Sequence, residues 1–93
     1  MYILAFATRA KKDLRKQKRS GNFPAEKFWI AMGYLERGQA LPISYRDHCL
    51  QGSLSIYREF HLATDLLVQY KRNNEKHIIT IAAIGSHVDL FGE

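Results

Sequence analysis

Residues 78–84 read Ile-Ile-Thr-Ile-Ala-Ala-Ile, a nearly continuous apolar run near the end of the 93-residue chain. An apolar run of this length without alternation is typical of an interior strand covered on both faces. Gly85 ends the run, and residues 86–91 are left as a short final element. We therefore predict a central strand over 78–84 and arrange the rest of the chain around it.

Two segments before this strand alternate between apolar and polar residues, which predicts strands with one buried face. Residues 56–62 alternate in this way, and so do residues 66–71. Asn73-Asn74 predicts the turn into the central strand. If residues 62–64 form the preceding turn, His61 and Asp65 lie opposite each other across a hairpin. Glu59 and His61 share a strand face.

The N-terminal half predicts one strand and two helices. Residues 2–6 form a short apolar run, and a helix over 9–19 has Thr8 as its expected cap and Gly21 as its stop. A second helix lies between Pro24 and Gly38, and residues 39–54 form a long irregular loop. The predicted fold is α+β, with two N-terminal helices on one face of a mainly antiparallel sheet. The order is β-α-α-β-β-β plus a short tail, in a single domain over 1–93.

Composition narrows the class of protein. The hydrophobic share of 46% and charged share of 25% suit one compact core and argue against a disordered chain. No apolar run approaches the roughly 18 residues that a membrane span needs. The single cysteine, Cys49, cannot form an intrachain disulfide. We expect a soluble cytoplasmic protein that does not bind membranes.

The positive charge is concentrated at the N-terminus. Residues 1–22 hold seven basic residues and one acidic residue, although the whole chain carries only +5. At about 100° per residue, six of the basic side chains fall within an arc of roughly 160° on the predicted helix 9–19. The six are Lys11, Lys12, Arg15, Lys16, Lys18 and Arg19. Such a face fits either a polyanion or acidic partner, or simply a solvated helix surface.

Three of the four histidines lie at the ends of predicted elements: His48 in the long loop, His61 at a strand end, and His87 after Gly85. His77 sits among charged residues, and we expect it to be exposed. Histidines beside a carboxylate, here Asp65 or Glu59, suit metal-independent cleavage of RNA by its own 2′-hydroxyl. The alternative is that each histidine is only a satisfied structural residue. Zinc is disfavoured, because no H-x₃₋₅-H or C-x₂-C spacing occurs.

Several stretches together resemble the YafQ branch of the RelE-like toxins, which belong to bacterial type II toxin–antitoxin modules. They are Asp47-His48-Cys49-Leu50-Gln51-Gly52, Tyr57-Arg58-Glu59-Phe60-His61, Asp65-Leu66-Leu67-Val68-Gln69-Tyr70-Lys71, and Gly85-Ser86-His87-Val88-Asp89-Leu90-Phe91. The resemblance implies a RelE-like microbial-ribonuclease fold and ribosome-dependent cleavage of mRNA without a cofactor. It also implies neutralisation by a cognate antitoxin, with the free toxin a monomer and the complex a hetero-oligomer.

The resemblance also assigns roles to individual residues. His87 corresponds to the general acid, and His48 or His61 to the base or a stabiliser of the phosphorane. Asp65 orients a histidine or helps to activate the hydroxyl, and Phe91 stacks on a base. The basic residues Lys11, Lys12, Arg15 and Lys16 then meet ribosomal RNA, antitoxin or both.

Two departures from the family pattern bear on activity. Leu66 stands where the family often has tryptophan, and residues 81–84 lack the basic residue that often precedes the Gly-x-His motif. We expect Arg58, Arg46 or Lys71 to replace that phosphate clamp. Two alternatives remain open: a non-enzymatic ParE-like toxin that inhibits gyrase, and a catalytically weakened homologue that binds only RNA or antitoxin. We also expect Trp29, Met32 and Tyr34 not to share one core, which leaves apolar surface for a partner.

Overall fold

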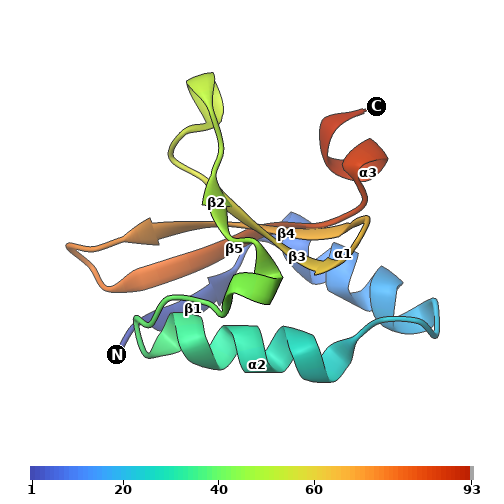
Figure 1. The fold of residues 1–93 in the computed structure, drawn as a ribbon, viewed down its shortest axis with the longest axis horizontal. Coiled ribbons are helices and arrows are strands. Elements are labelled where there is room, and N and C mark those ends of the chain that lie inside the picture. The colour runs from blue at the N-terminus through green and yellow to red at the C-terminus, as the bar shows by residue number, and fades with distance from the viewer. Residues whose placement is uncertain (93) are drawn as a thin grey trace.

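The computed structural model describes residues 1–92 and contains a five-stranded sheet with the strand order β1-β5-β4-β3-β2 (Figure 1). β5 (Ile78–Gly85) lies between β1 (Ile3–Phe6) and β4 (Leu66–Asn73), as expected of the apolar run. β1 pairs with β5 in parallel, and the other three pairings are antiparallel. The predicted α+β fold with a mainly antiparallel sheet is therefore confirmed.

Two helices pack beside β1 and β5. α1 (Thr8–Arg19) contacts β5 and β1, and α2 (Ala25–Glu36) runs below the sheet in Figure 1. The core between them contains Phe28, which is fully buried against the rings of Phe6 and Phe23. Met32 is buried as well, whereas Trp29 is 49% exposed. The expected division of the apolar residues of α2 between core and surface is confirmed.

α1 is also tied to the sheet by a polar contact. The backbone N–H of Ile84 donates to the Asp13 carboxylate at 2.9 Å, and Ala10 is fully buried. The basic side chains of α1 face outward as its periodicity predicts. The helix begins at Thr8 itself, with Ala7 as the N-cap residue and no side-chain cap, so the expected cap by Thr8 is wrong.

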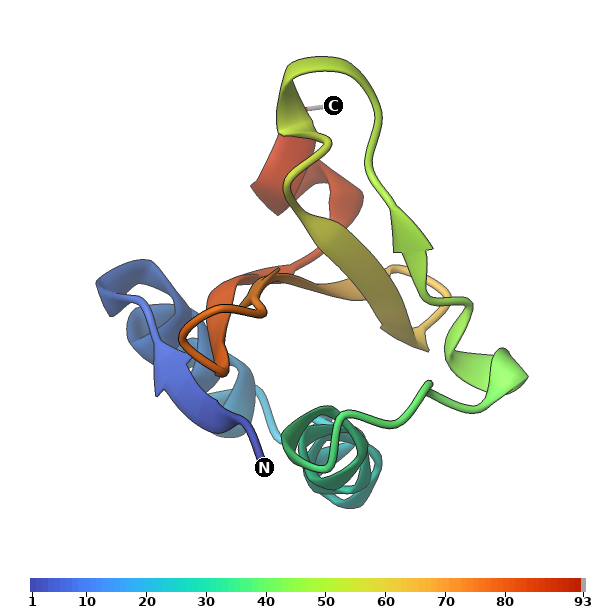
Figure 2. The ribbon, with the colours of Figure 1, turned by 90° about the vertical axis from the view of Figure 1, so that its left-hand side faces the viewer.

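The long segment between α2 and the hairpin contains an element that sequence reasoning missed. A 3₁₀ turn over Ile43–Tyr45 leads into β2 (His48–Cys49), which pairs with β3 (Arg58–Ala63). A second 3₁₀ turn over Gly52–Leu54 lies in the connection, which rises from the sheet on the same side as the C-terminal helix α3 (His87–Phe91) (Figures 1 and 2). Ile56 belongs to this connection and is 66% exposed, so it is not part of the predicted strand.

The β3–β4 hairpin differs from the predicted one in its turn. β3 continues to Ala63, with a bulge between His61 and Ala63, and Ala63 pairs with Leu66. His61 therefore lies opposite Leu67 instead of Asp65, which belongs to the turn. The shift arises because β3 extends to Ala63 and the chain reverses over residues 64 and 65, whereas the bulge offsets it by one residue. Asp65 is thereby moved beyond the strands, towards α3.

Candidate active site

The sheet brings two of the predicted site residues together on the face that points away from the core. β2 pairs His48 with Glu59, and β3 pairs Glu59 with Gln69. Phe60 and Leu62 point into the core, so Glu59 and His61 occupy the opposite face, as period-two alternation predicts. The rings of His48 and His61 lie 6.0 Å apart between centroids.

The third histidine reaches the same place because the chain turns sharply after β5. Ser86 caps α3 in a capping box, in which its hydroxyl accepts from Asp89 N–H and the Asp89 carboxylate accepts from Ser86 N–H, both at 3.1 Å. A Cβ on Gly85 would lie 2.8 Å from the Asp89 Cβ, so this close return requires glycine. As a result, His87 opens α3 with its ring 6.5 Å from that of His61.

Asp65 fixes His87 by two contacts. One carboxylate oxygen of Asp65 accepts from the backbone N–H of His87 at 2.9 Å and lies 2.7 Å from its ring Nδ1. These bonds, the backbone one first, hold the pKa of Asp65 below its usual value. Because Nδ1 is engaged, the Nε2 side of the His87 ring is left for a substrate. Phe91 extends the row of rings, 6.2 Å from His87.

His61, between the other two histidines, has a different environment. Burial lowers its pKa from 6.5, and the positive charge of Arg46 lowers it further. Its Nδ1 is buried without a hydrogen-bond partner among residues 1–92. Both features favour the neutral ring, which is the form that accepts a proton.

A polar network on the opposite side of β3 fixes the residue before His48. Asp47 accepts from the Arg58 guanidinium at 3.2 and 3.3 Å and from the Tyr70 hydroxyl at 2.8 Å. Burial, with Asp47 adding to it, strongly raises the pKa of Tyr70, so the hydroxyl remains a donor. This network anchors β2 and thereby positions His48. Sequence reasoning did not find it, because only the fold brings Asp47, Arg58 and Tyr70 together.

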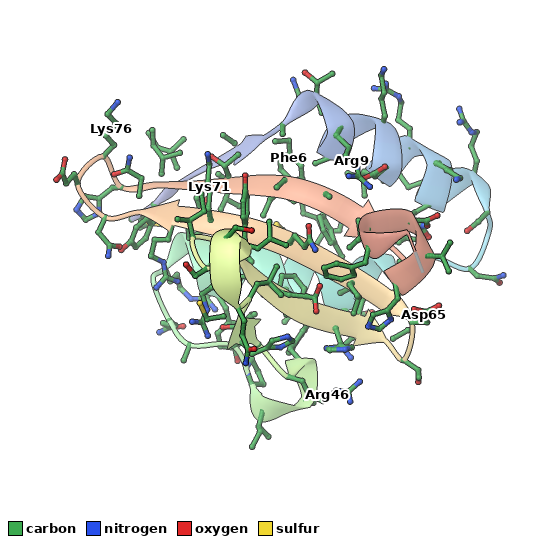
Figure 3. All side chains as sticks on the ribbon, turned by 90° about the horizontal axis from the view of Figure 1, so that it is seen from above. Phe6, Arg9, Arg46, Asp65, Lys71 and Lys76 are labelled. Carbon is green, nitrogen blue, oxygen red and sulfur yellow. The ribbon has the colours of Figure 1, made fainter. Side chains whose placement is uncertain are left out.

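The predicted phosphate-binding residues are not all near the histidines. Arg58 projects from the core face of β3 and is paired with Asp47. Lys71 shares the histidine face but lies further along β4, where its ammonium group is 5.9 Å from the Tyr57 ring centroid. Figure 3 shows Asp65 and Arg46 towards one end of the sheet and Lys71 nearer the other. Arg46, whose charge acts on His61, is thus the candidate beside the histidines.

The remaining candidates lie at the periphery. The side chains of Lys11, Lys12, Arg15 and Lys16 are exposed on α1. His77 is exposed in the β4–β5 turn, with its ring 5.1 Å from that of Tyr2, so the expected surface position is confirmed.

Comparison with known proteins identifies the family of the chain. The profile of the family described as bacterial toxin of type II toxin–antitoxin system, YafQ, matches residues 2–92. The chain belongs to the YafQ toxin family. The family resemblance expected from the sequence is confirmed.

Individual relatives of this YafQ-family chain are similar in sequence and fold. The mRNA interferase toxin YafQ of Escherichia coli K12 is 38% identical over 52 residues, which span 56% of this chain and 54% of the relative. The match to the curated relatives thus spans about half of their length. YafQ in the E. coli DinJ–YafQ complex superposes with a TM-score of 0.86 at 26% identity, over 99% of this chain and 100% of the other.

A metal-bound toxin from Helicobacter pylori is another structural relative. It superposes on this YafQ-family chain with a TM-score of 0.88 at 32% identity, over 98% of this chain and 100% of that one. In the part of this chain that the structure describes, no group of three or more His, Cys, Asp or Glu side chains is arranged to hold a metal ion. Within the same residues, none of the helices has the length and apolar character needed to cross a membrane.

Proposed function

We propose that residues 1–93 act as one toxin domain, a ribosome-dependent mRNA endoribonuclease that uses acid–base catalysis without a metal ion or cofactor. The observation that carries the proposal is the convergence of His48, His61 and His87 on one sheet face, with Asp65 bonded to His87. The curated relative is an mRNA interferase, which supports the same reaction class. If each histidine had only a structural role, the three rings would have no reason to lie together.

The reaction follows from the two ring environments. Neutral His61 removes the proton from the ribose 2′-hydroxyl, and the 2′-oxygen attacks the phosphorus. The bond to the 5′-oxygen breaks, and that oxygen takes a proton from His87. The products are a 2′,3′-cyclic phosphate and a 5′-hydroxyl end. Asp65 supports this step by holding the His87 ring through Nδ1, and exposed Phe91 is suited to stack on a base.

The ribosome and an antitoxin are the proposed partners. The exposed basic face of α1 suits the phosphates of ribosomal RNA. Beside it, Phe6, Leu14 and Trp29 line an apolar hollow of about 330 Å³ whose other lining residues are Lys11 and Arg15. We propose this surface for a cognate antitoxin, because the E. coli relative forms a complex with DinJ. The free toxin is then a monomer and the neutralised form a hetero-oligomer.

A cleavage assay on translated mRNA tests the function. The wild-type chain is expected to produce fragments with 5′-hydroxyl ends only when ribosomes translate the message. His87→Ala is expected to lower the rate at least about 10²-fold, because the leaving oxygen loses its proton donor. His77→Ala is the matched control and should cleave normally.

Parallel readouts separate the alternatives. A supercoiling assay with gyrase tests the ParE-like alternative, in which wild type inhibits gyrase and cuts no mRNA. Ribosome or antitoxin binding without cleavage by wild type would identify a weakened homologue. Full activity of His87→Ala would contradict the proposed mechanism.

A further inference from the structure

One buried ionisable group has no role in the reaction described above. Within residues 1–92, Glu59 is the only charged residue that is buried, at 4% exposure. It lies in a cross-strand row that runs from His48 on β2 through Glu59 and Gln69 to Ala83 on β5. Its neighbours His48 and His61 belong to the site itself.

We propose that Glu59 is a positioning residue that holds His48 as an imidazolium, and that this cation stabilises the charge on the phosphorane. The inference rests on the ribonuclease function proposed above. Of the two roles left open for His48, base and stabiliser of the phosphorane, it selects the second. It also identifies a source of positive charge, which residues 81–84 do not supply.

The surroundings of Glu59 call for a cationic partner. One carboxylate oxygen lies 3.4 Å from the Gln69 side-chain nitrogen, and the other lies 3.4 Å from His48 Nε2. A buried carboxylate is unfavourable unless it is hydrogen-bonded and paired with positive charge. Gln69 supplies a neutral donor, so His48 is the one of these two neighbours that can supply the charge.

The contacts of the two ring nitrogens of His48 fit the same form. Its Nδ1 lies 2.8 Å from the backbone carbonyl oxygen of Arg46, which can only accept, so Nδ1 carries a proton. Its Nε2 lies 3.4 Å from the Glu59 carboxylate, an ion-pair contact in which a protonated nitrogen is attracted and a lone pair is repelled. An imidazole ring that carries a proton on both nitrogens is the cation. In that form the ring has no lone pair with which to remove a proton from the 2′-hydroxyl.

The position of His48 suits a charge rather than a base. The position of Ala83, within the stretch where the family often has a basic residue, lies in the same cross-strand row, but alanine carries no charge. The imidazolium at the other end of the row is 6.0 Å from the His61 ring. Preorganised charge beside developing negative charge is an effective source of transition-state stabilisation. Glu59 is in contact with His48, and the charged or titratable groups that act on the adjacent His61 are Arg46, Glu59, His48 and His87.

Two substitutions at His48 separate a charge from a base. His48→Gln removes both functions, and we expect single-turnover mRNA cleavage to fall about 10²-fold or more. His48→Arg keeps a positive charge but cannot act as a base, and we expect it to stay within about 10-fold of wild type. Equal loss in the two variants would overturn the inference. His77→Gln and His77→Arg are the matched controls, and thermal unfolding checks that each variant folds.

Glu59→Gln tests the positioning role with a readout that does not depend on cleavage. Histidine ring ¹⁵N resonances of the free chain near neutral pH are expected to show both His48 nitrogens protonated in wild type. Glu59→Gln should shift His48 towards the neutral ring, whereas Glu75→Gln, in the exposed β4–β5 turn, should not. A neutral His48 in wild type would overturn the inference. If wild type shows the cation but cuts no mRNA, the proposed function fails while the Glu59–His48 pairing stands.

Discussion

The histidine face of the sheet and the basic face of α1 both carry ionisable side chains, but they are organised differently. On the sheet, individual groups have fixed partners: His87 with Asp65 at 2.7 Å, and His48 with Glu59 at 3.4 Å. On α1, the side chains of Lys11, Lys12, Arg15 and Lys16 form no salt bridge within residues 1–92. The sheet face therefore holds individual side chains in fixed positions, whereas the face of α1 contributes only positive charge.

This difference predicts how each surface responds to substitution. Acid–base chemistry depends on one atom at one place, so the loss of a single side chain on the sheet should greatly reduce the rate. A cluster of solvated charges acts collectively through the phosphates it neutralises, so each member of α1 should contribute a small and salt-dependent share.

The largest effect is expected at His61. His61→Ala removes the proposed base, and Asp65→Ala releases the ring of the proposed acid. Each should lower the cleavage rate about 10²-fold or more, equivalent to at least about 2.7 kcal/mol of transition-state stabilisation. His77→Ala, an exposed histidine in the β4–β5 turn, should leave the rate unchanged.

The pH profile sharpens the same prediction. The pKa of His61 is lowered from 6.5, chiefly by burial, so the ring stays neutral as the pH falls and loses its base form only below that value. The acid limb of kcat/KM should therefore lie below pH 6.5 in wild type. An acid limb above this pH, or near-normal cleavage by His61→Ala, would exclude His61 as the base.

The sequence predicted the central strand, the two helices and the shared face of Glu59 and His61, because these follow from hydrophobic periodicity. It did not predict β2, since a strand of two residues is too short to show a period. It placed the hairpin turn at 62–64 instead of 64–65, because nothing in residues 62 and 63 marks that the strand continues. The grouping of Asp47 with Arg58 and Tyr70 also escaped prediction, because it depends on contacts 11 and 23 residues apart.

The site residues also divide into those that the sequence predicted and those that only the fold revealed. His48, His61, His87 and Asp65 were recognised as a group through the motifs of a known family, and spacing alone left their proximity open. The single clue to Arg46 was its charge, whereas its place beside His61 follows from the turn before β2. Alternation along the predicted strand places Arg58 on the face opposite Glu59 and His61, but its pairing with Asp47 depends on the fold.

A smaller effect is expected from the basic face of α1. Replacing Lys11, Lys12, Arg15 and Lys16 by Gln should weaken ribosome binding at low salt. The slope of log affinity against log salt should fall by up to about 3.6, since each of the four neutralised phosphates contributes about 0.7–0.9. Ribosome binding measured over a salt series gives this slope.

The matched control removes the same charge elsewhere. Lys27, Arg37, Arg72 and Lys76 lie outside α1, and their replacement by Gln should change the slope much less. An equal change in both quadruple variants would mean that only net charge matters. An unchanged slope in the α1 variant would remove α1 from the ribosome contact.

The smallest expected effect is that of metal removal. In the proposed reaction His61 and His87 move the protons and His48 supplies charge, so no step needs a metal ion. The toxin would be treated with EDTA, separated from the chelator, and added to ribosomes kept in their usual magnesium, so that the ribosome remains intact. Cleavage should equal that of untreated toxin. Lost activity that returns on adding a transition metal would show that the sheet face works through a bound ion, and the division between fixed side-chain chemistry and collective charge would no longer hold.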